Sequence, residues 1–200
     1  MPYKKYMKAS ACALLLLLCP AATLAEPETI LQDAAQNPVL IEAIAQQNRQ
    51  YEDATSFELM KLDTRWQAET AAMKRPLIEG VLYSPTSQYL KKLADEHQVK
   101  DMIYVTDQRG LLVAATTMTY RYIMDDSSLW RQAFLADKNQ VLRNAAEDPG
   151  YMVLSRGVRD PKTGDVIGVI SIITSNAGTP PPTQHAATTE TDPPAEWPDS

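Results

Sequence analysis

Apolar and polar positions recur with a helical period in the first half of the chain and with a strand-like period after residue 100. The first helical segment covers Ile30 to Tyr51. Within it, Asn37-Pro38 predicts that the helix restarts, because Asn is a favourable N-cap and Pro is tolerated at the first helical position.

Two further helices are predicted before residue 100. Thr55 and Glu58 have the spacing of a capping box, and apolar side chains then recur at helical intervals to about Met73. Ser84-Pro85 opens the next helix, which carries apolar side chains on one face and ends near His97.

The second half of the chain predicts two strand pairs with a short helix between them. The expected elements are strands at 101–106 and 111–116, a helix at 128–136, and strands at 151–158 and 166–174. Gly110 supplies the turn between the first two strands, since glycine adopts backbone conformations that other residues resist. Helices followed by an antiparallel sheet indicate the α+β class.

The first 25 residues have the pattern of a secretory signal peptide. Three lysines precede an apolar run at 9–19, and Thr23-Leu24-Ala25 places small residues at the −3 and −1 positions of a cleavage site. An uncleaved anchor helix is the alternative, but the run is shorter than the roughly 20 residues that span a bilayer. We therefore expect export to the periplasm.

Cleavage after Ala25 would change both the cysteine content and the charge. Both cysteines lie in the leader, so no disulfide or thiolate metal site is expected afterwards. Of the 19 basic residues, 16 remain against 25 acidic ones, which gives a net charge near −9. That charge argues against nucleic acid or an anionic membrane surface as a partner. No later segment has the length and hydropathy of a membrane span.

Residues 176–200 are rich in Pro and Thr, and Trp197 is their only large apolar side chain. Such a composition buries too little apolar surface to offset the entropy of ordering, so a disordered tail is expected. The remaining residues, 26–175, suit a single domain.

Three motifs in the second half resemble those of a known family. They are Ile103-Tyr104-Val105-Thr106-Asp107-x-x-Gly110, Tyr120-Arg121-Tyr122-x-x-Asp125-Asp126 with Trp130 downstream, and Asp160…Gly164…Ile167-Gly168-Val169-Ile170. In this order they resemble a Cache domain, the extracytoplasmic PAS-like sensor module of bacterial receptors. The resemblance covers roughly 30–175. It implies a long helical region packed on an antiparallel sheet of about five strands, with a small-molecule pocket on one sheet face.

The chain departs from the usual Cache receptor. Those sensors normally lie between two transmembrane helices and feed a kinase, cyclase or chemotaxis domain, whereas here a predicted leader and a Pro-rich tail flank the domain. The resemblance therefore implies a freestanding module that relays its signal to a separate membrane-bound signalling protein, or that simply carries a ligand.

Motifs of common catalytic and cofactor sites are missing from the sequence. The histidines are His97 and His185, which argues against a two-histidine metal site and a Ser-His-Asp triad. There is also no Gly-x-Ser-x-Gly elbow and no phosphate-binding glycine loop. We expect neither an enzyme nor a cofactor or metal site.

The candidate ligand-binding residues combine aromatic and charged side chains. They are Tyr104, Tyr120, Arg121, Tyr122, Asp125, Asp126, Trp130 and Arg156. Aromatic walls with a carboxylate suit an amine, while the Arg121 guanidinium could instead pair with a ligand carboxylate. The predicted ligand is therefore a small polar molecule: an amine, an amino acid or a carboxylate.

Each of these residues also has a purely structural interpretation. Asp126 could cap the helix that starts near Ser128, the aromatic group could be ordinary core, and Asp63-x-x-Trp66 could serve helix packing. The adjacent carboxylates of Asp125 and Asp126 could alternatively bind Ca²⁺ or Mg²⁺, or act as acid and base. The alternative function is an interaction or regulatory protein of the cell envelope with a vestigial pocket.

Overall fold

The computed structural model describes residues 27–99, 102–125, 128–136, 140–145 and 151–175. The predicted leader and tail lie outside these residues. The helices are α1 (Pro27–Ala34), α2 (Pro38–Gln50), α3 (Ser56–Thr70), α4 (Pro76–Leu82), α5 (Pro85–Glu96) and α6 (Ser128–Phe134). The strands are β1 (Met102–Asp107), β2 (Leu112–Ala115), β3 (Leu142–Ala145), β4 (Tyr151–Arg159) and β5 (Val166–Ser175).

The predicted helix starts are confirmed by their caps. The Asn37 side chain accepts a hydrogen bond from the Val39 amide at the start of α2. Thr55 and Glu58 form the full capping box at the start of α3. Because the chain restarts at Asn37, α1 and α2 can follow different directions across the sheet.

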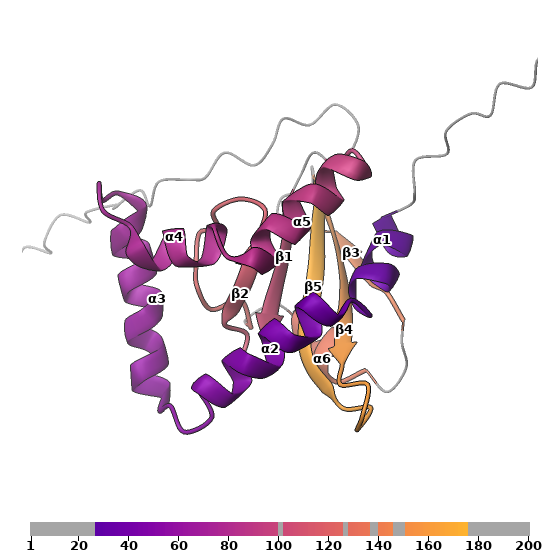
Figure 1. The fold of residues 1–200 in the computed structure, drawn as a ribbon, viewed down its shortest axis with the longest axis horizontal. Helices are drawn as coiled ribbons and strands as arrows, with labels where there is room; N and C mark the ends of the chain where they lie inside the picture. The colour runs from indigo at the N-terminus through magenta and orange to yellow at the C-terminus, as the bar shows by residue number, and fades with distance from the viewer. Residues whose placement is uncertain (1–26, 100–101, 126–127, 137–139, 146–150, 176–200) are drawn as a thin grey trace, which may run out of the picture.

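The strands form one antiparallel sheet in the order β2-β1-β5-β4-β3. The last strand of the chain thus lies in the middle, between β1 and β4. Figure 1 shows α1, α2 and α5 on one side of this sheet and α6 on the other, with α3 and α4 beside the β2 edge. The α+β prediction is confirmed. The two short elements α4 and β3 were not predicted from the sequence.

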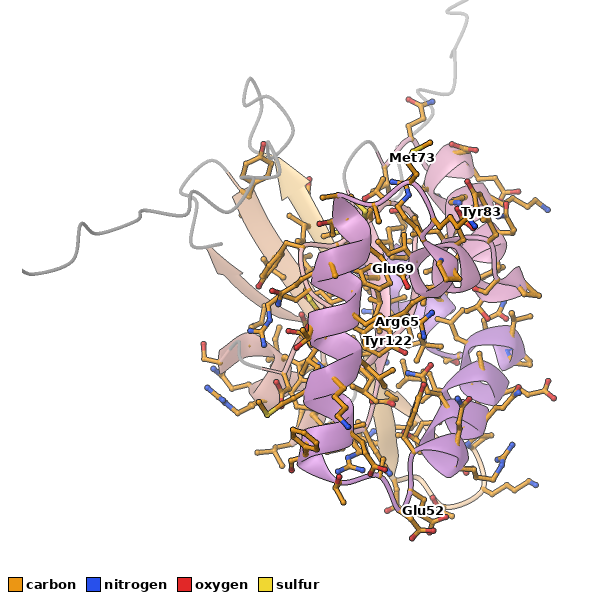
Figure 2. All side chains as sticks on the ribbon, turned by 90° about the vertical axis from the view of Figure 1, so that its left-hand side faces the viewer. Glu52, Arg65, Glu69, Met73, Tyr83 and Tyr122 are labelled. Carbon is orange, nitrogen blue, oxygen red and sulfur yellow. The ribbon has the colours of Figure 1, made fainter. Side chains whose placement is uncertain are left out.

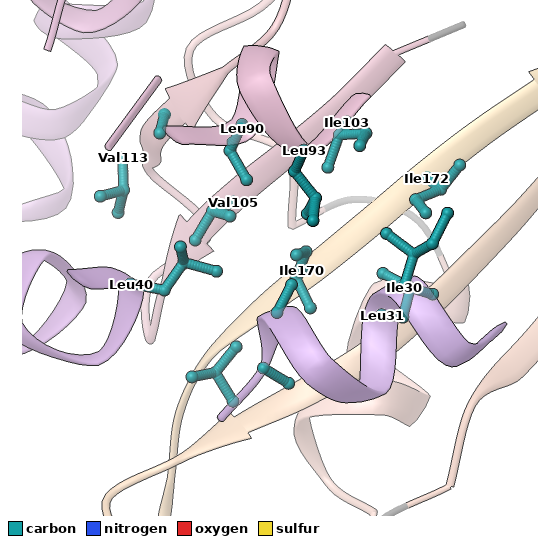
Figure 3. Packing of buried hydrophobic residues seen from close by; sticks show 14 of the residues in the cluster. Ile30, Leu31, Leu40, Leu90, Leu93, Ile103, Val105, Val113, Ile170 and Ile172 are labelled. Atoms are coloured by element: carbon teal, nitrogen blue, oxygen red, sulfur yellow. The ribbon is translucent and has the colours of Figure 1, made fainter. Parts of the chain in front are cut away.

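The largest core cluster lies between the sheet and the helices α1, α2 and α5 (Figure 3). Alternate strand residues point to the same face, so this face receives Ile103 and Val105 of β1 and Ile170 and Ile172 of β5. Leu154 continues the layer on β4. We call this side the helix-covered face.

A second core cluster joins α3 and α4 to β2 and to the opposite face of β1. It contains Trp66 and Ile78 from the helices, and Tyr104 and Leu112 from the strands. Trp66 is completely buried. This cluster fixes α3 against the edge of the sheet.

Polar side chains at the end of α2 fasten it to both hairpins. The Asn48 amide donates to the Ile167 carbonyl at 2.9 Å and accepts from the Gln108 amide at 3.0 Å. Arg109 in the β1–β2 turn donates to the Tyr51 and Ala54 carbonyls at 2.8 and 2.7 Å. The corner between α2 and α3 is therefore held by a strand turn.

Helix α4 takes its N-terminal cap from another helix. Arg75, at its N-cap position, supplies no side-chain hydrogen bond. Instead, the carboxylate of Glu69 on α3 accepts from the Leu77 amide at 2.7 Å and the Ile78 amide at 3.1 Å, and it pairs with Arg65 at 2.8 Å. Figure 2 shows Arg65 and Glu69 between the two helices. Pro76 at the first position of α4 is a local signal for a helix start, but a cap that another helix supplies leaves no local signal in the sequence.

Gly168 should not tolerate alanine. A Cβ there would lie 2.2 Å from the Thr106 carbonyl oxygen and 3.0 Å from Ile44, and the backbone oxygen cannot move aside cheaply. We expect Gly168→Ala to lower the free energy of unfolding by about 1–3 kcal/mol or more. Gly80→Ala is the matched control, because nothing lies within 4 Å of its Cβ position in α4. It should raise stability by about 0.5–1 kcal/mol. Urea unfolding of both variants checks the pair, and equal effects would contradict the packing.

Glu69 should make stability depend on acid pH. Burial by itself raises the pKa of its carboxyl, but hydrogen bonds from Ile78, Arg65 and Leu77 outweigh burial and hold the pKa below its usual 4.5. The stabilisation is therefore complete above pH 4.5 and is lost as pH falls through the lowered folded-state pKa.

The test is melting temperature against pH for Glu69→Gln, with the exposed Glu52→Gln as control. Glu69→Gln should be less stable at neutral pH and should show a smaller loss on acidification. A wild-type pH profile in the Glu69 variant would contradict this role.

Candidate functional site

A row of hydroxyl groups crosses the sheet on the face opposite α1, α2 and α5. The register places Tyr104 of β1 opposite Ser171 of β5, and Ser171 opposite Ser155 of β4. These side chains point away from the helix-covered face, because their neighbours Ile103, Leu154, Ile170 and Ile172 point into it. All three are nearly inaccessible to solvent, with exposed fractions of 5%, 0% and 1%. We call them the hydroxyl row.

Hydrogen bonds organise this part of the sheet. The Ser155 and Ser171 hydroxyls lie 2.8 Å apart and are bonded to each other. Two residues after Tyr104 on β1, and therefore on the same face, the Thr106 hydroxyl accepts a 2.8 Å hydrogen bond from the Trp130 indole of α6. A sheet face that serves only as core would carry apolar side chains at these positions, so the hydroxyls call for an explanation.

Helix α6 lies directly against this face. A Cβ on Gly157 would lie 2.9 Å from the Ala133 carbonyl, so the missing side chain permits the close approach. The Trp130 and Phe134 rings are stacked with centroids 5.1 Å apart. Trp130 thus stands next to the hydroxyl row, where sequence analysis predicted a ligand contact.

The 116–125 connection is fastened to α3 by Asp63 and Trp66. The Asp63 carboxylate accepts from the Tyr122 amide at 2.8 Å and the Ile123 amide at 3.1 Å, and it lies 3.4 Å from the Arg121 guanidinium. The Trp66 indole donates to the Thr119 carbonyl at 2.9 Å. The Asp63-x-x-Trp66 motif therefore packs its helix, as its structural interpretation expected, and also fixes the aromatic connection.

Tyr122 belongs to the core. It is 2% exposed, and the centroid of its ring lies 5.5 Å from that of Trp66. Figure 2 labels Tyr122 beside α3. Burial raises the pKa of its phenol far above the usual value, and the neighbouring Tyr51 and Asp107 raise it further. Tyr122 therefore stays neutral in the folded protein.

Asp107 is a buried carboxyl that serves the β1–β2 turn. It accepts from the Arg109 amide at 2.8 Å, the Leu111 amide at 2.9 Å and the Gln47 side chain at 3.2 Å. Burial raises its pKa despite these hydrogen bonds. Its acceptor oxygens are thus used by the turn and by Gln47 of α2.

The remaining residues of the aromatic motif are not gathered in one place. Tyr120 is 60% exposed and Asp125 is also exposed, while Arg121 extends to Asp63. Asp126 lies outside the described residues. Of the predicted set, Tyr104 and Trp130 are therefore the two that the described structure brings to the hydroxyl face.

Arg156 does not lie on the same face as Tyr104 and Trp130. It is paired with Ile170, between Leu154 and Val158, so its side chain belongs to the helix-covered face. The period of two in a strand sends residues 155 and 156 to opposite sides. The charge of Arg156 made it a candidate, whereas its even position in the strand sends it to the other face from Ser155.

Thr106, Ser155 and Ser171 were not among the residues predicted for the site. A signal existed, because Ser171 interrupts the apolar run Ile170–Ile173 and Ser155 follows Leu154. A small polar residue in the middle of a buried strand predicts either a paired hydroxyl or a site. The register that joins the two serines cannot be read from the sequence.

The described part of the chain holds no cluster of three or more His, Cys, Asp or Glu side chains that could bind a metal ion. A search of the same residues for a helix both long and apolar enough to cross a bilayer finds none.

No protein-family model and no curated protein matches this chain. Some solved structures are similar to this chain. The sensor domain of the V. cholerae histidine kinase DctB is 12% identical, with a TM-score of 0.38 over 68% of this chain and 56% of that one. The ligand-binding domain of the Campylobacter jejuni chemoreceptor Tlp3 in complex with L-norvaline is 11% identical, with a TM-score of 0.35 over 74% and 61%.

A third similar structure is the ligand-binding domain of the Pseudomonas aeruginosa PAO1 amino acid chemoreceptor PctC in complex with GABA. It is 11% identical, with a TM-score of 0.34 over 74% of this chain and 61% of that one. This chain thus spans less than two thirds of the length of each of these domains. Sensor domains of bacterial receptors are among the solved structures similar to it.

Asp63 should be essential for stability. Asp63→Ala leaves the Tyr122 and Ile123 amides without their acceptor and should cost about 3 kcal/mol of unfolding free energy. Asp63→Asn keeps one acceptor oxygen and should cost less. Asp125→Ala, the same change at an exposed position of the same connection, should stay within about 0.5 kcal/mol of the wild type. Denaturant unfolding ranks the three variants, and a small effect of Asp63→Ala would contradict the anchoring.

Proposed function

We propose that this chain is a sensor module that binds a small polar ligand on the face of its sheet next to α6. The observation that carries the proposal is the hydroxyl row, Tyr104, Ser171 and Ser155, beside the Thr106–Trp130 hydrogen bond. Small-molecule sites typically combine aromatic walls with a few placed polar groups, and this face provides both.

The side chains on this face indicate the class of ligand. Hydroxyl groups both donate and accept hydrogen bonds, so they suit ammonium, carboxylate and hydroxyl groups alike. Trp130 and Tyr104 add aromatic surface for the ligand's apolar part or for a cation. An amine, an amino acid or a carboxylate meets these conditions, and the chain acts on it by binding rather than by chemistry.

The proposal includes the cellular setting. Residues 1–25 act as a cleaved signal peptide, 26–175 form the sensor domain in the periplasm, and 176–200 form a flexible Pro/Thr-rich tail. The module relays ligand binding to a separate membrane-bound signalling protein. The leader pattern and the acidic charge of the remaining chain support this arrangement.

The alternative is an envelope interaction protein whose pocket has been lost. One observation favours it: Phe57 and Met60 on α3 are 65% and 61% exposed. Exposed apolar side chains on one helix can mark a contact surface. Under this alternative the hydroxyl row is only a polar feature of the core.

A ligand screen on the full chain tests the sensor proposal. Thermal unfolding is measured with aliphatic amino acids, γ-aminobutyrate, diamines and mono- and dicarboxylates. At a hundred times its Kd a true ligand adds about 2.7 kcal/mol of stability. Ser171→Ala should then weaken binding of that ligand about tenfold, because it removes the centre of the hydroxyl row.

Ile172→Val is the matched control, since it is the next residue of β5 but points to the helix-covered face. It should leave the Kd unchanged while costing about 0.5–1.5 kcal/mol of stability. The sensor proposal fails if no compound in the screen binds. It also fails if the Kd of a bound compound is unaffected by Ser171→Ala.

A further inference from the structure

The carboxyl group of Asp107 lies where α2 meets the turn between β1 and β2, and the residue is completely buried. Its Oδ1 accepts the backbone amides of Arg109 and Leu111 at 2.8 and 2.9 Å. Its Oδ2 accepts the side-chain amide of Gln47, on α2, at 3.2 Å. Within the described residues, the hydrogen-bond donors to this carboxyl are therefore all neutral groups.

The side-chain amide of Gln47 also joins α2 to the start of β2. Its Nε2 lies 3.3 Å from the carbonyl oxygen of Leu111 and 3.4 Å from that of Leu112, in addition to its contact with Asp107. All three neighbours are acceptors, so the nitrogen of the amide, and not its oxygen, belongs on this side. The arrangement depends on an ionised Asp107, because only a carboxylate has two oxygens that accept without donating.

The charged and titratable groups around Asp107 do not favour its ionised form. Arg109 is the cation of the turn, but its guanidinium donates to the carbonyls of Tyr51 and Ala54. Burial raises the pKa of Asp107 more than its hydrogen bonds and the Arg109 charge lower it. Tyr122 is close enough for the Asp107 charge to raise the pKa of its phenol, as Tyr51 does too, and it stays neutral.

Protonation of Asp107 would place two donors face to face. Oδ1 keeps its two backbone amides, so the proton goes to Oδ2, the oxygen that Gln47 contacts. An O–H and an N–H cannot donate to each other, so the amide has to turn its oxygen toward the carboxyl group or withdraw. Either movement takes Nε2 away from the carbonyls of Leu111 and Leu112.

We propose that Asp107 and Gln47 form a pH-sensitive latch between α2 and the start of β2. The latch is closed when Asp107 is ionised and open when it is protonated. Asn48, the next residue of α2, keeps its hydrogen bonds to Ile167 and Gln108 in both states, because neither bond involves a titratable group. The end of α2 therefore stays attached while its contact with β2 opens.

The latch acts on the connection that carries Tyr122. The Leu112 amide donates to the Tyr122 carbonyl at 2.9 Å, and Leu111 forms a bridge with Ile123. A change at the carbonyls of Leu111 and Leu112 is thus transmitted to residues 116–125 by direct backbone contacts.

The experiment follows the full chain by NMR from neutral pH down to about pH 4. The readouts are the carboxyl carbon of Asp107, the side-chain amides of Gln47 and Asn48, and the carbonyl carbons of Leu111 and Leu112. We expect Asp107, Gln47 and the two carbonyls to change with one common midpoint above 3.8, the usual pKa of an aspartate. The Asn48 amide should not follow this midpoint.

The same proton changes the stability with a defined sign. Because the pKa of Asp107 is raised by folding, this group stabilises the fold fully below pH 3.8, and the stabilisation is lost as pH rises through the folded-state pKa. The melting temperature of the wild type relative to Asp107→Asn should therefore rise on acidification. A carboxylate with a purely structural role would give a constant or falling difference.

Three variants complete the test. Asp107→Asn presents a donor to Gln47 at every pH, so its Leu111 and Leu112 carbonyl shifts at neutral pH should match those of the acidified wild type and should not titrate. Gln47→Met removes the amide, and these carbonyls should then no longer follow Asp107. Asp53→Asn makes the same change at an exposed position of the α2–α3 corner and should keep the wild-type titration.

The proposal is overturned if the Asp107 midpoint lies at or below 3.8, or if the two carbonyls do not share it. It is also overturned if all amides shift together, since that would indicate general acid unfolding, or if Asp53→Asn abolishes the titration. If Asp107→Asn does not fold, the wild-type titration and Gln47→Met still decide the outcome.

Discussion

The buried carboxylate of Asp63 is the constraint on which the arrangement around the candidate site depends. It stands on α3, and it binds the backbone amides of Tyr122 and Ile123, which lie 59 and 60 residues further along the chain. Without it these amides would have to find other partners inside the protein, at a cost of about 1–3 kcal/mol each. Together with the Trp66 indole on the same helix, this side chain fixes the course of residues 116–125.

Successive side chains of a strand point to opposite faces, so the two faces of the sheet carry different types of residue. On the helix-covered face, Ile103, Ile170 and Leu154 provide ordinary core, and Arg156 is the exception. On the other face, the hydroxyl row occupies the equivalent positions, shifted by one residue. A substitution at one residue of β4 therefore addresses one face of the sheet alone.

Local signals in the sequence were enough for much of the fold. Asn37-Pro38 and the Thr55–Glu58 box marked helix starts that the structure confirms, because a cap acts within one turn of chain. Helix α4 was not predicted, and its cap comes from Glu69 of another helix. The site was harder to predict, because it also depends on residues that are far apart in the sequence. Tyr104 and Trp130 were found by residue type, whereas only the strand register places Ser155 beside Ser171.

Tyr104 connects the candidate ligand face to helix α3. It is one end of the hydroxyl row, and it also belongs to the core cluster that contains Trp66. Trp66 in turn holds the Thr119 carbonyl, next to the connection that Asp63 fixes. Packed side chains do not deform continuously, so a ligand that displaced Tyr104 would have to repack this cluster. Tyr104 and Trp66 thus connect the candidate ligand face to α3 by direct packing. The proposed relay of ligand binding to a partner would require a connection of this kind.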